Sequence, residues 1–377
     1  MPRVADVVAF LKRFAPLELV EEWDNVGLLL GDSDSEAGAV LTCLTLTPDV
    51  AREAIGRKAG LIVSHHPVLF RAVKRISNHD REGQMLLELI AAGVAVYCPH
   101  TAYDSASDGI NQQLSRLMGL THIEPLRPWS SSGSCKIVCF VPRSHLAAVQ
   151  EALWSAGAGV IGEYAKCSFV QDGTGSFEGA ATSKPAIGQS QRLEEVSEAR
   201  VEVVCPDRLA ADALRRVRSV HPYEEPVIDV YPLNENPSIR GSGRVGLLPV
   251  AAVHEPARGS AISLADFLAL VKVRLGISEV PFVGELSRPI VRVAVACGSG
   301  GEFLPDAIAR KCDVLLTGEA RFHTCLEARD AGIGLILAGH YATERPAMEY
   351  LAAVLSREFP EISVSASESE RDPIQWR

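Results

Sequence analysis

The stretch LIVSHHPVLF (residues 61–70) ends an apolar run with two adjacent histidines, His65 and His66, followed by a proline. Residues 61–64 are typical of a buried strand. Pro67 biases His66 toward an extended backbone, which fixes the direction in which the histidine pair leaves the strand. Two explanations are open: a satisfied polar pair at a sheet edge, or two ligands of a metal centre. The rest of the chain bears on this choice.

Strand and helix patterns alternate around this stretch, and the last third of the chain repeats the alternation. Unbroken apolar strands between helices indicate a parallel or mostly parallel sheet that is covered on both faces. We therefore predict an α/β fold with two similar α/β halves that form one outer domain. The strand-like segments are VLTCLTL (40–46), LIVSHH (61–66), VAVYCPH (94–100), IVRVAVACGSG (290–300), DVLLTGE (313–319) and IGLILAGH (333–340).

The middle of the chain has a different pattern. It opens on a Pro/Ser/Gly-rich boundary and contains strand-helix-strand units with a Gly/Ser-rich stretch at 171–189, which suits a hairpin or loop. This pattern predicts a small inserted α+β domain of the ferredoxin-like type. The predicted borders are 1–125 for the first half, 126–250 for the insert and 251–377 for the second half.

Composition narrows the class of protein. The chain has 37 Lys and Arg against 47 Asp and Glu, a net charge of −10, so nucleic-acid binding is not expected. No run is long and apolar enough to span a bilayer. The first residues read as an amphipathic helix, not a signal peptide. The nine cysteines form no CxxC pair and read as reduced thiols, which predicts a cytoplasmic protein.

Ligand-type side chains follow the predicted strands. Since ligands of open α/β sheets bind at the carboxyl ends of strands, these side chains are expected to meet in one crevice. Imidazole and carboxylate groups suit zinc, manganese or iron(II). Five ligands drawn from these clusters are too many for one four-coordinate ion and fit two ions roughly 3.5–4 Å apart. The clusters are His65 and His66, then His100 and Asp104 in HTAYD, Glu319 in TGE, and His340 and Glu344 in GHYATE.

Each cluster alone also has a structural explanation. His100 and Asp104 suit a turn, and Glu344 suits a helix cap. The turn GSGG (298–301) is either a phosphate cradle or a plain tight turn. The sequence EEWDNVGLLLGD (21–32) contains Trp23, expected as a core anchor, and Asp24 and Asn25, expected as caps or site-lining residues. The motif HPYEEP (221–226) is explained as well by a capped turn. The joint placement of the strand-end clusters favours a metal centre.

Seven motifs, in order, resemble the GTP cyclohydrolase I type 2 family, also called the Nif-three-like family. The resemblance covers essentially the whole chain and includes the tail ESERDPIQW (368–376). The motifs are EEWDNVGLLLGD, SHHPVLF, HTAYD, HPYEEPVIDVYPL, GSGRVGLL, TGE and GHYATE.

The resemblance implies a dinuclear divalent-metal site held by His65, His66, Asp104, His340 and Glu344. Glu344 would bridge the ions, with His66 and Asp104 on one ion and His65 and His340 on the other. It further implies a toroidal homohexamer in which the middle region is an optional PII-like insert. The chain departs from the family at Thr45, where many members have Asp.

Two functions are compatible with these features. The first is a metal-dependent hydrolase that acts on a nucleotide or another phosphorylated small molecule, with a metal-bridging hydroxide as nucleophile. The second is a metal-binding or regulatory hexamer whose insert senses a ligand. The sequence shows no obvious separate general base, which weakens the first. Open coordination positions would favour the hydrolase, and a closed shell would favour the regulator.

Overall fold

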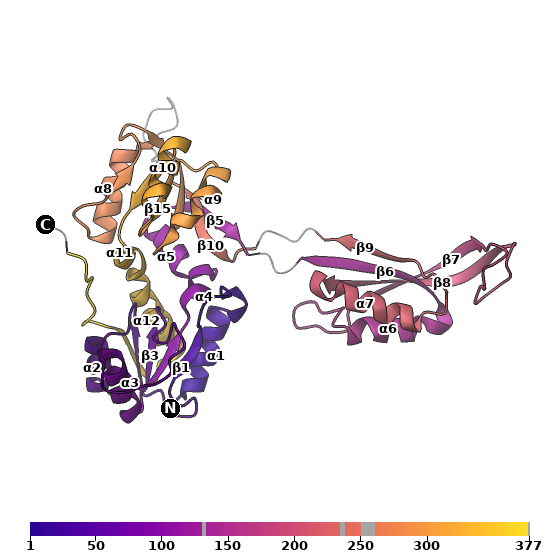
Figure 1. The fold of residues 1–377 in the computed structure, drawn as a ribbon, viewed down its shortest axis with the longest axis horizontal. Coiled ribbons are helices and arrows are strands. Elements are labelled where there is room, and N and C mark those ends of the chain that lie inside the picture. The colour runs from indigo at the N-terminus through magenta and orange to yellow at the C-terminus, as the bar shows by residue number, and fades with distance from the viewer. Residues whose placement is uncertain (130–132, 234–237, 250–260, 376–377) are drawn as a thin grey trace. The chain divides into compact units, whose positions relative to one another are not determined.

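A computed structural model describes residues 1–129, 133–233, 238–249 and 261–375 of the 377. The chain forms two compact units (Figure 1). The first consists of Met1–Trp129 and Ser238–Arg377, and the second of Ser130–Pro237. In the described residues, no helix is long and apolar enough to cross a membrane.

The first sheet of the first unit carries the histidine pair. Its order is β1-β4-β3-β2-β17, with β1 antiparallel at one edge and the other four strands parallel. The strands are β1 (Gly27–Leu30), β2 (Ala39–Cys43), β3 (Leu61–Ser64), β4 (Ala95–Cys98) and β17 (Ser363–Ala366). The helices of this part are α1 (Val4–Phe14), α2 (Pro48–Gly56), α3 (Arg81–Ala91), α4 (His100–Ser105) and α5 (Ile110–Leu117), with the 3-10 turn η1 (Leu17–Leu19).

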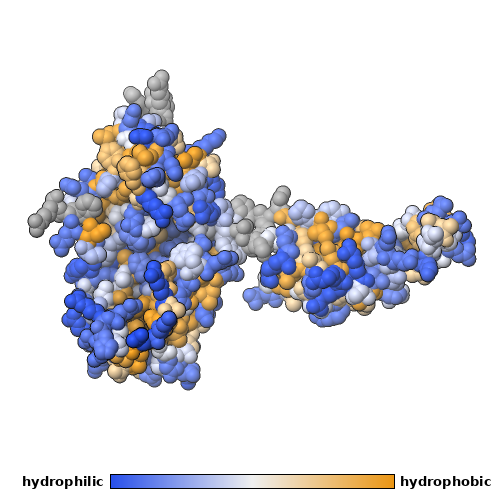
Figure 2. Space-filling model, viewed as in Figure 1, coloured by the Kyte–Doolittle hydropathy of each residue, from blue (hydrophilic) through white to orange (hydrophobic). Residues whose placement is uncertain are grey.

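Helices cover both faces of this sheet because alternate strand residues are apolar on both sides. Leu41 and Ile62 pack against α2 and α3, whereas Val40 and Val63 pack in the cluster that contains the apolar face of α1. Figure 1 shows α2 and α3 on one side of the strands and α1 on the other. Much of the solvent-facing surface of α2 and α3 is hydrophilic (Figure 2), although Leu87 and Ile90 of α3 are exposed. Both faces are therefore buried, as the unbroken apolar strands predict.

The second sheet of the first unit has the order β12-β16-β15-β14-β10-β5. Its strands β14, β15 and β16 are parallel, and β5, β10 and β12 pair antiparallel. The strands are β5 (Thr121–Pro128), β10 (Gly241–Leu247), β12 (Phe282–Val283), β14 (Arg292–Ala296), β15 (Val314–Thr317) and β16 (Gly334–Leu337). The other elements are β11 (Ile262–Ser263), β13 (Pro289–Ile290), α8 (Leu264–Leu275), η3 (Gly300–Phe303), α9 (Leu304–Ala309), α10 (Phe322–Ala331), α11 (His340–Glu344) and α12 (Pro346–Glu358).

The end of the chain joins the first sheet, not the second. Strand β17 pairs parallel with β2, and α12 packs on both strands. Thr42 Oγ1 in β2 donates to Met348 O in α12 at 2.8 Å. In the other direction, β5 lies in the second sheet although it follows the first sheet in sequence. Each sheet thus contains elements from both expected halves, 1–125 and 251–377.

Strand β5 precedes the second unit in sequence and strand β10 follows it, and the two strands pair with each other. Gly241 lies opposite Pro128, and Trp129 N–H donates to Arg240 O at 2.9 Å. Both strands lie in the second sheet, so the unit borders fall at 129/130 and 237/238, whereas the sequence analysis placed them at 125/126 and 250/251. The difference arises because a strand pair, not a change in composition, closes the first unit.

The second unit is an antiparallel sheet with two helices on one face. The sheet order is β7-β8-β6-β9, and the element order is strand-helix-strand-strand-helix-strand. Its core consists of apolar residues of β6 and β8 packed against both helices. The elements are β6 (Ser134–Pro142), η2 (Arg143–His145), α6 (Leu146–Ser155), β7 (Phe169–Glu178), β8 (Leu193–Pro206), α7 (Asp207–Val220) and β9 (Ile228–Pro232).

Candidate metal centre

The histidine pair continues the ladder of β3 beyond its last strand residue. The N–H groups of His65 and His66 donate to Cys43 O at 2.9 Å and Leu44 O at 2.8 Å. Ser64 Oγ donates to His66 O at 2.8 Å. The His65 side chain is 1% exposed. Backbone hydrogen bonds, which β2 provides, therefore hold both imidazoles at the carboxyl end of the first sheet.

Short helices after two other strands bring the remaining candidate ligands to the same place. Asp104 lies in α4, which begins two residues after β4, and His340 and Glu344 lie in α11 after β16. His340 and Glu344 are four residues apart and so share one helix face. Glu344 Oε2 lies 3.1 Å from His66 Nε2 and 3.1 Å from His340 Nε2. His65 Nε2 lies 3.6 Å from Asp104 Oδ1.

All five side chains expected as ligands thus gather in one cluster, which we call the strand-end cluster. His65 is nearest to Asp104, and Glu344 Oε2 is equally near His66 and His340. The resemblance assigns His66 and His340 to different ions, and that division stays a prediction. Glu344 thus contacts one expected ligand of each ion, as a bridging carboxylate would.

The donor atoms of the strand-end cluster suit a metal ion. Both ring nitrogens of His65 are buried without a hydrogen-bond partner among the described residues, and the buried Nε2 of His340 has Glu344 as its neighbour. Burial lowers the pKa of His65, so its imidazole is neutral and keeps a free lone pair. Buried polar atoms are rarely left without a partner, and a neutral imidazole beside a carboxylate is an ordinary ligand set for zinc, manganese or iron(II). The residues present therefore fit divalent ions.

The pKa values of the two carboxylates in the cluster, Glu344 and Asp104, shift in opposite directions. Glu344 is 4% exposed. Its burial acts to raise its pKa, but hydrogen bonds from His340 and His66 hold the pKa well below the usual value. Burial raises the pKa of Asp104, and the nearby charge of Glu344 raises it further. The hydrogen bond with Glu344 raises the pKa of His340 to about 9. An ion bound here would have to displace that proton.

His100 and Asp24 form a buried pair beside the cluster, and the sequence did not reveal it as a pair. Asp24 Oδ1 lies 2.7 Å from His100 Nδ1, and Asp24 Oδ2 accepts hydrogen bonds from Thr101. Burial acts to raise the pKa of Asp24, but the bonds from His100 and Thr101 lower it to about 2. Nitrogen atoms of His65, His66 and His100 lie within 4.8 Å of one another. The signal available was WDN (23–25) together with a histidine directly after β4.

Thr45, the departure from the family pattern, contacts a candidate ligand. Its Oγ1 lies 2.7 Å from His66 Nδ1. The backbone N–H of Thr45 donates to Glu370 Oε1 at 2.6 Å, and that of Leu44 donates to Glu370 Oε2 at 3.0 Å. Glu370 also lies 2.8 Å from Arg345 Nε. A buried glutamate of the C-terminal segment therefore fixes the backbone that positions Thr45 against the ring of His66.

Glu319 orients His340 in a similar way. Its Oε1 lies 3.1 Å from His340 Nδ1 and accepts a hydrogen bond from Ser299. These two hydrogen bonds lower the pKa of Glu319. The turn that contains Ser299 packs closely against the cluster: a Cβ added to Gly298 would lie only 2.1 Å from Glu344 Oε1. Gly298 has φ +58°, so this position requires glycine both for its backbone and for space.

A cavity of about 450 Å³ opens in front of the cluster. Its aromatic walls are Trp23, Phe70 and Phe303, and its lining residues, all within the described part of the chain, include no lysine or arginine. Trp23 is 60% exposed, so the expectation of a core anchor was wrong. Its ring centre lies 6.0 Å from those of Phe70 and His100. Trp23 lies in the loop before β1 and forms an exposed wall of this cavity.

Comparisons with known proteins give consistent results. The sequence model described as Duf34/NIF3 (NGG1p interacting factor 3) matches residues 2–373. A Listeria monocytogenes protein named GTP cyclohydrolase 1 type 2 homolog is 33% identical over 378 residues, which cover 98% of each chain. A Mycobacterium tuberculosis protein of the same name is 36% identical and covers 95% of this chain and 92% of its own.

Solved structures agree over the full length. Staphylococcus aureus protein SA1388 is 29% identical with a TM-score of 0.77, and the match covers 100% of this chain and 99% of that one. A Bacillus cereus protein related to NIF3 is 29% identical with a TM-score of 0.69 and the same coverage.

Proposed function

The chain belongs to the Duf34/NIF3 family, and from this premise we propose that it is a dinuclear metal-dependent hydrolase. The strand-end cluster would hold two divalent ions through His65, His66, Asp104, His340 and Glu344. The substrate would be a nucleotide or another phosphorylated small molecule. The observation that carries the proposal is the single oxygen of Glu344 that lies 3.1 Å from two imidazoles of different elements.

The protein's own groups support such a site by orienting its ligands. When bound, two divalent ions supply Lewis acidity and lower the pKa of bound water. Thr45 and Glu319 each contact the Nδ1 atom of a candidate ligand, His66 and His340, and so direct the Nε2 atoms toward Glu344. Such outer contacts typically set ring orientation and ligand basicity.

The pair of His100 and Asp24 supplies a group for proton transfer. No such group was evident from the sequence. Asp24 accepts from Nδ1–H of His100, which leaves Nε2 available to take up a proton from a reacting group. His100 lines the same cavity as His66 and Glu344. A base held in one tautomer by a buried carboxylate is a recurrent arrangement in hydrolases.

The cavity favours a substrate with a planar ring and an anionic part. Trp23 and Phe70 offer exposed aromatic surface for a base. Without a lysine or arginine among the described lining residues, the anionic part would depend on the bound ions for its countercharge. A phosphorylated compound therefore fits the metal-loaded site.

The family resemblance supports two further parts of the proposal, a toroidal homohexamer and a PII-like second unit. The cysteine pattern supports a cytoplasmic location, and the repeated strand-helix pattern supports two similar α/β halves. The element order of the second unit, strand-helix-strand-strand-helix-strand, is that of ferredoxin-like folds, which supports the PII-like second unit. The alternative function remains a non-catalytic metal-binding or regulatory hexamer. The observation that favours it is a separate cavity in the second unit.

A metal-replete assay separates the two functions. The full chain is loaded with zinc, manganese or iron(II) and incubated with nucleotides and phosphate esters, and products are measured by chromatography and phosphate release. If the chain is a hydrolase, wild-type protein should turn over at least one compound, and this turnover should be lost in His65→Ala. Wild-type protein that holds two ions but turns over nothing would favour the regulator. Turnover that persists in His65→Ala would show that the activity does not depend on the strand-end cluster.

A further inference from the structure

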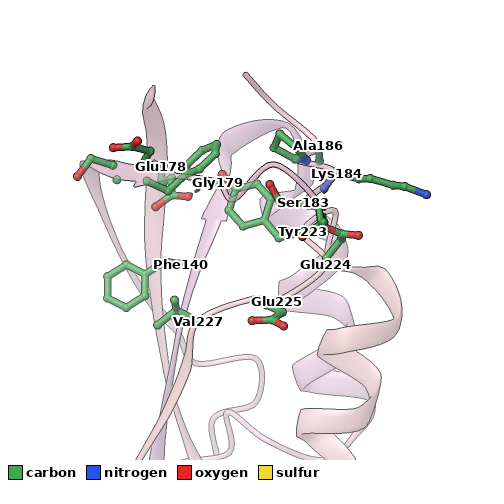
Figure 3. A pocket seen from close by; sticks show the side chains of 16 residues that line it. Phe140, Glu178, Gly179, Ser183, Lys184, Ala186, Tyr223, Glu224, Glu225 and Val227 are labelled. Atoms are coloured by element: carbon green, nitrogen blue, oxygen red, sulfur yellow. Dashed lines mark hydrogen bonds between the residues drawn. The ribbon is translucent and has the colours of Figure 1, made fainter. Parts of the chain in front are cut away.

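The second unit contains a cavity of about 840 Å³. Its walls come from the end of β7, the segment 179–186 that follows it, Glu198 of β8 and the turn after α7 (Figure 3). A volume in this range suits a small-molecule site. The turn belongs to the motif HPYEEP (221–226), which plays no part in the strand-end cluster.

The lining residues are strongly acidic. The charged side chains that line the cavity are four carboxylates and one ammonium group. The carboxylates belong to Glu178, Glu198, Glu224 and Glu225, and the ammonium group belongs to Lys184. The Lys184 side chain extends away from the other labelled side chains in Figure 3. Within the described residues, the carboxylates of Glu178 and Glu225 have no hydrogen bond or ion pair. The cavity therefore repels anions and retains two uncompensated charges for a cation.

The HPYEEP turn is held in place before any ligand arrives. His221 is buried, with Nε2 2.9 Å from Phe140 O, and its Nδ1 accepts the N–H of Tyr223 at 3.2 Å. Tyr223 donates its hydroxyl to Glu198 Oε1 at 2.7 Å. Glu224 Oε2 accepts the backbone N–H of Lys184 at 3.0 Å. The turn is thus tied to β6, to β8 and to the segment after β7, so the cavity is largely pre-formed.

Aromatic side chains complete the wall. Phe140, Phe177 and Tyr223 line the cavity together with the carboxylates. An aromatic face attracts a cation through its quadrupole, and a carboxylate adds a charge-assisted hydrogen bond. We propose that this cavity binds a small organic cation that carries ammonium or guanidinium groups. The site lies wholly within the second unit and is independent of the proposed hydrolase.

A metal ion fits this cavity less well. Groups of three or more ligand atoms within 4.8 Å of one another occur, among the described residues, only around His65, His66, His100, His340 and Glu344. No three of the cavity's carboxylates are therefore close enough to coordinate one ion together. A longer molecule with several positive groups can reach separated carboxylates, which a single metal ion cannot.

Calorimetric titration of the full chain tests the proposal. Spermidine represents polyamines, argininamide represents the guanidinium group, and magnesium chloride tests a bare cation, all in 0.15 M NaCl. We expect one organic cation per chain in this cavity. Glu178→Gln/Glu225→Gln should weaken it by about tenfold or more, because two charge-assisted contacts are lost. Phe177→Leu should weaken it by about two- to fivefold through loss of the ring face.

A control double variant removes two negative charges from the second unit at positions outside the cavity. Glu163 and Glu195 are exposed and do not line the cavity, so Glu163→Gln/Glu195→Gln should bind within about twofold of wild type. The proposal is overturned if neither organic cation binds, if both double variants lose binding equally, or if magnesium binds more tightly through the same two glutamates. Circular dichroism establishes that each variant is folded, and the glutamine variants decide even if Phe177→Leu unfolds.

Discussion

His66 and Glu344 are 278 residues apart in sequence, yet His66 Nε2 and Glu344 Oε2 lie 3.1 Å apart. His66 follows a strand of the first sheet, whereas Glu344 ends the short helix that follows a strand of the second. The contact therefore joins the two sheets of the first unit. Because the same oxygen also approaches His340, the carboxylate occupies the place that a ligand shared by two ions would take.

Glu344→Ala should damage the metal site more than His65→Ala. A bridging carboxylate contacts both ions and offsets their mutual repulsion, whereas one imidazole serves one ion. Glu344→Ala should weaken both sites by more than the roughly 10–100-fold that loss of an outer contact costs, and His65→Ala should spare one ion. Calorimetric metal titration of both variants measures this.

Glu358→Ala serves as the matched control, since Glu358 is exposed at the end of α12 and should bind as wild type does. The alternative is that Glu344 is only a cap, worth about 1 kcal/mol of stability. If Glu344→Ala still binds two ions at near wild-type affinity, Glu344 is only a cap and does not bridge the ions.

Removing the second unit should leave a folded metal-binding protein. No residue of the strand-end cluster lies between 130 and 237, and Pro128 and Gly241 already pair across the gap. Replacing 130–237 with Gly-Ser should therefore convert β5 and β10 into a hairpin. Metal titration and thermal unfolding test the shortened chain. If it is folded and soluble but binds no metal, the second unit contributes to the site after all.

Thr45→Val should weaken metal binding without unfolding the protein. The hydroxyl lies 2.7 Å from His66 Nδ1, and loss of a partner to the non-ligating nitrogen typically costs 10–100-fold in metal affinity. Thr45→Asp restores an acceptor and should bind at least as tightly as wild type. Nitrogen NMR of His66 reports its tautomer independently of affinity. Equal affinity and an unchanged tautomer in Thr45→Val would show that the hydroxyl does not position the ring.

The Asp24 carboxylate should make stability depend on pH in the acid range. Hydrogen bonds from His100 and Thr101 outweigh burial and lower its pKa from 3.8 to about 2, so the unfolded chain binds more protons between these values. Stability from Asp24 is therefore present above about pH 3.8 and is lost as pH falls through about 2. Urea unfolding in the presence of chelator should show a shallower acid slope for Asp24→Asn.

Asp34→Asn provides the comparison, because the Asp34 side chain is 78% exposed and its removal should leave the slope unchanged. An Asp24→Asn slope equal to that of wild type would mean that the pair with His100 contributes nothing to the folded state.

The gathering of the five candidate ligands could be predicted because the rule behind it is local. Each follows the carboxyl end of a parallel strand, as His65 follows β3 and His340 follows β16, and such ends meet at one edge. That the side chains hold metal stays a prediction. The close approach of Glu344, on the buried face of a five-residue helix, to Gly298 of another segment was outside the reach of any local pattern.

Contacts between distant segments could not be predicted. Strand β17 pairs with β2, and Glu370 then accepts the amides of Leu44 and Thr45. Nothing in the pattern of residues 363–370 specifies which sheet they join. Likewise, Asp24 reaches His100 only because β1 returns antiparallel beside β4. Such pairings depend on the tertiary arrangement, which periodicity does not encode.

The metal content of the protein tests the central claim most directly. Protein purified without chelator, and protein stripped and then reconstituted with zinc, manganese or iron(II), are analysed by elemental mass spectrometry after removal of free metal. The account predicts two divalent ions per chain in wild type and a loss of both in Glu344→Ala. A stoichiometry near zero that reconstitution cannot raise would contradict it.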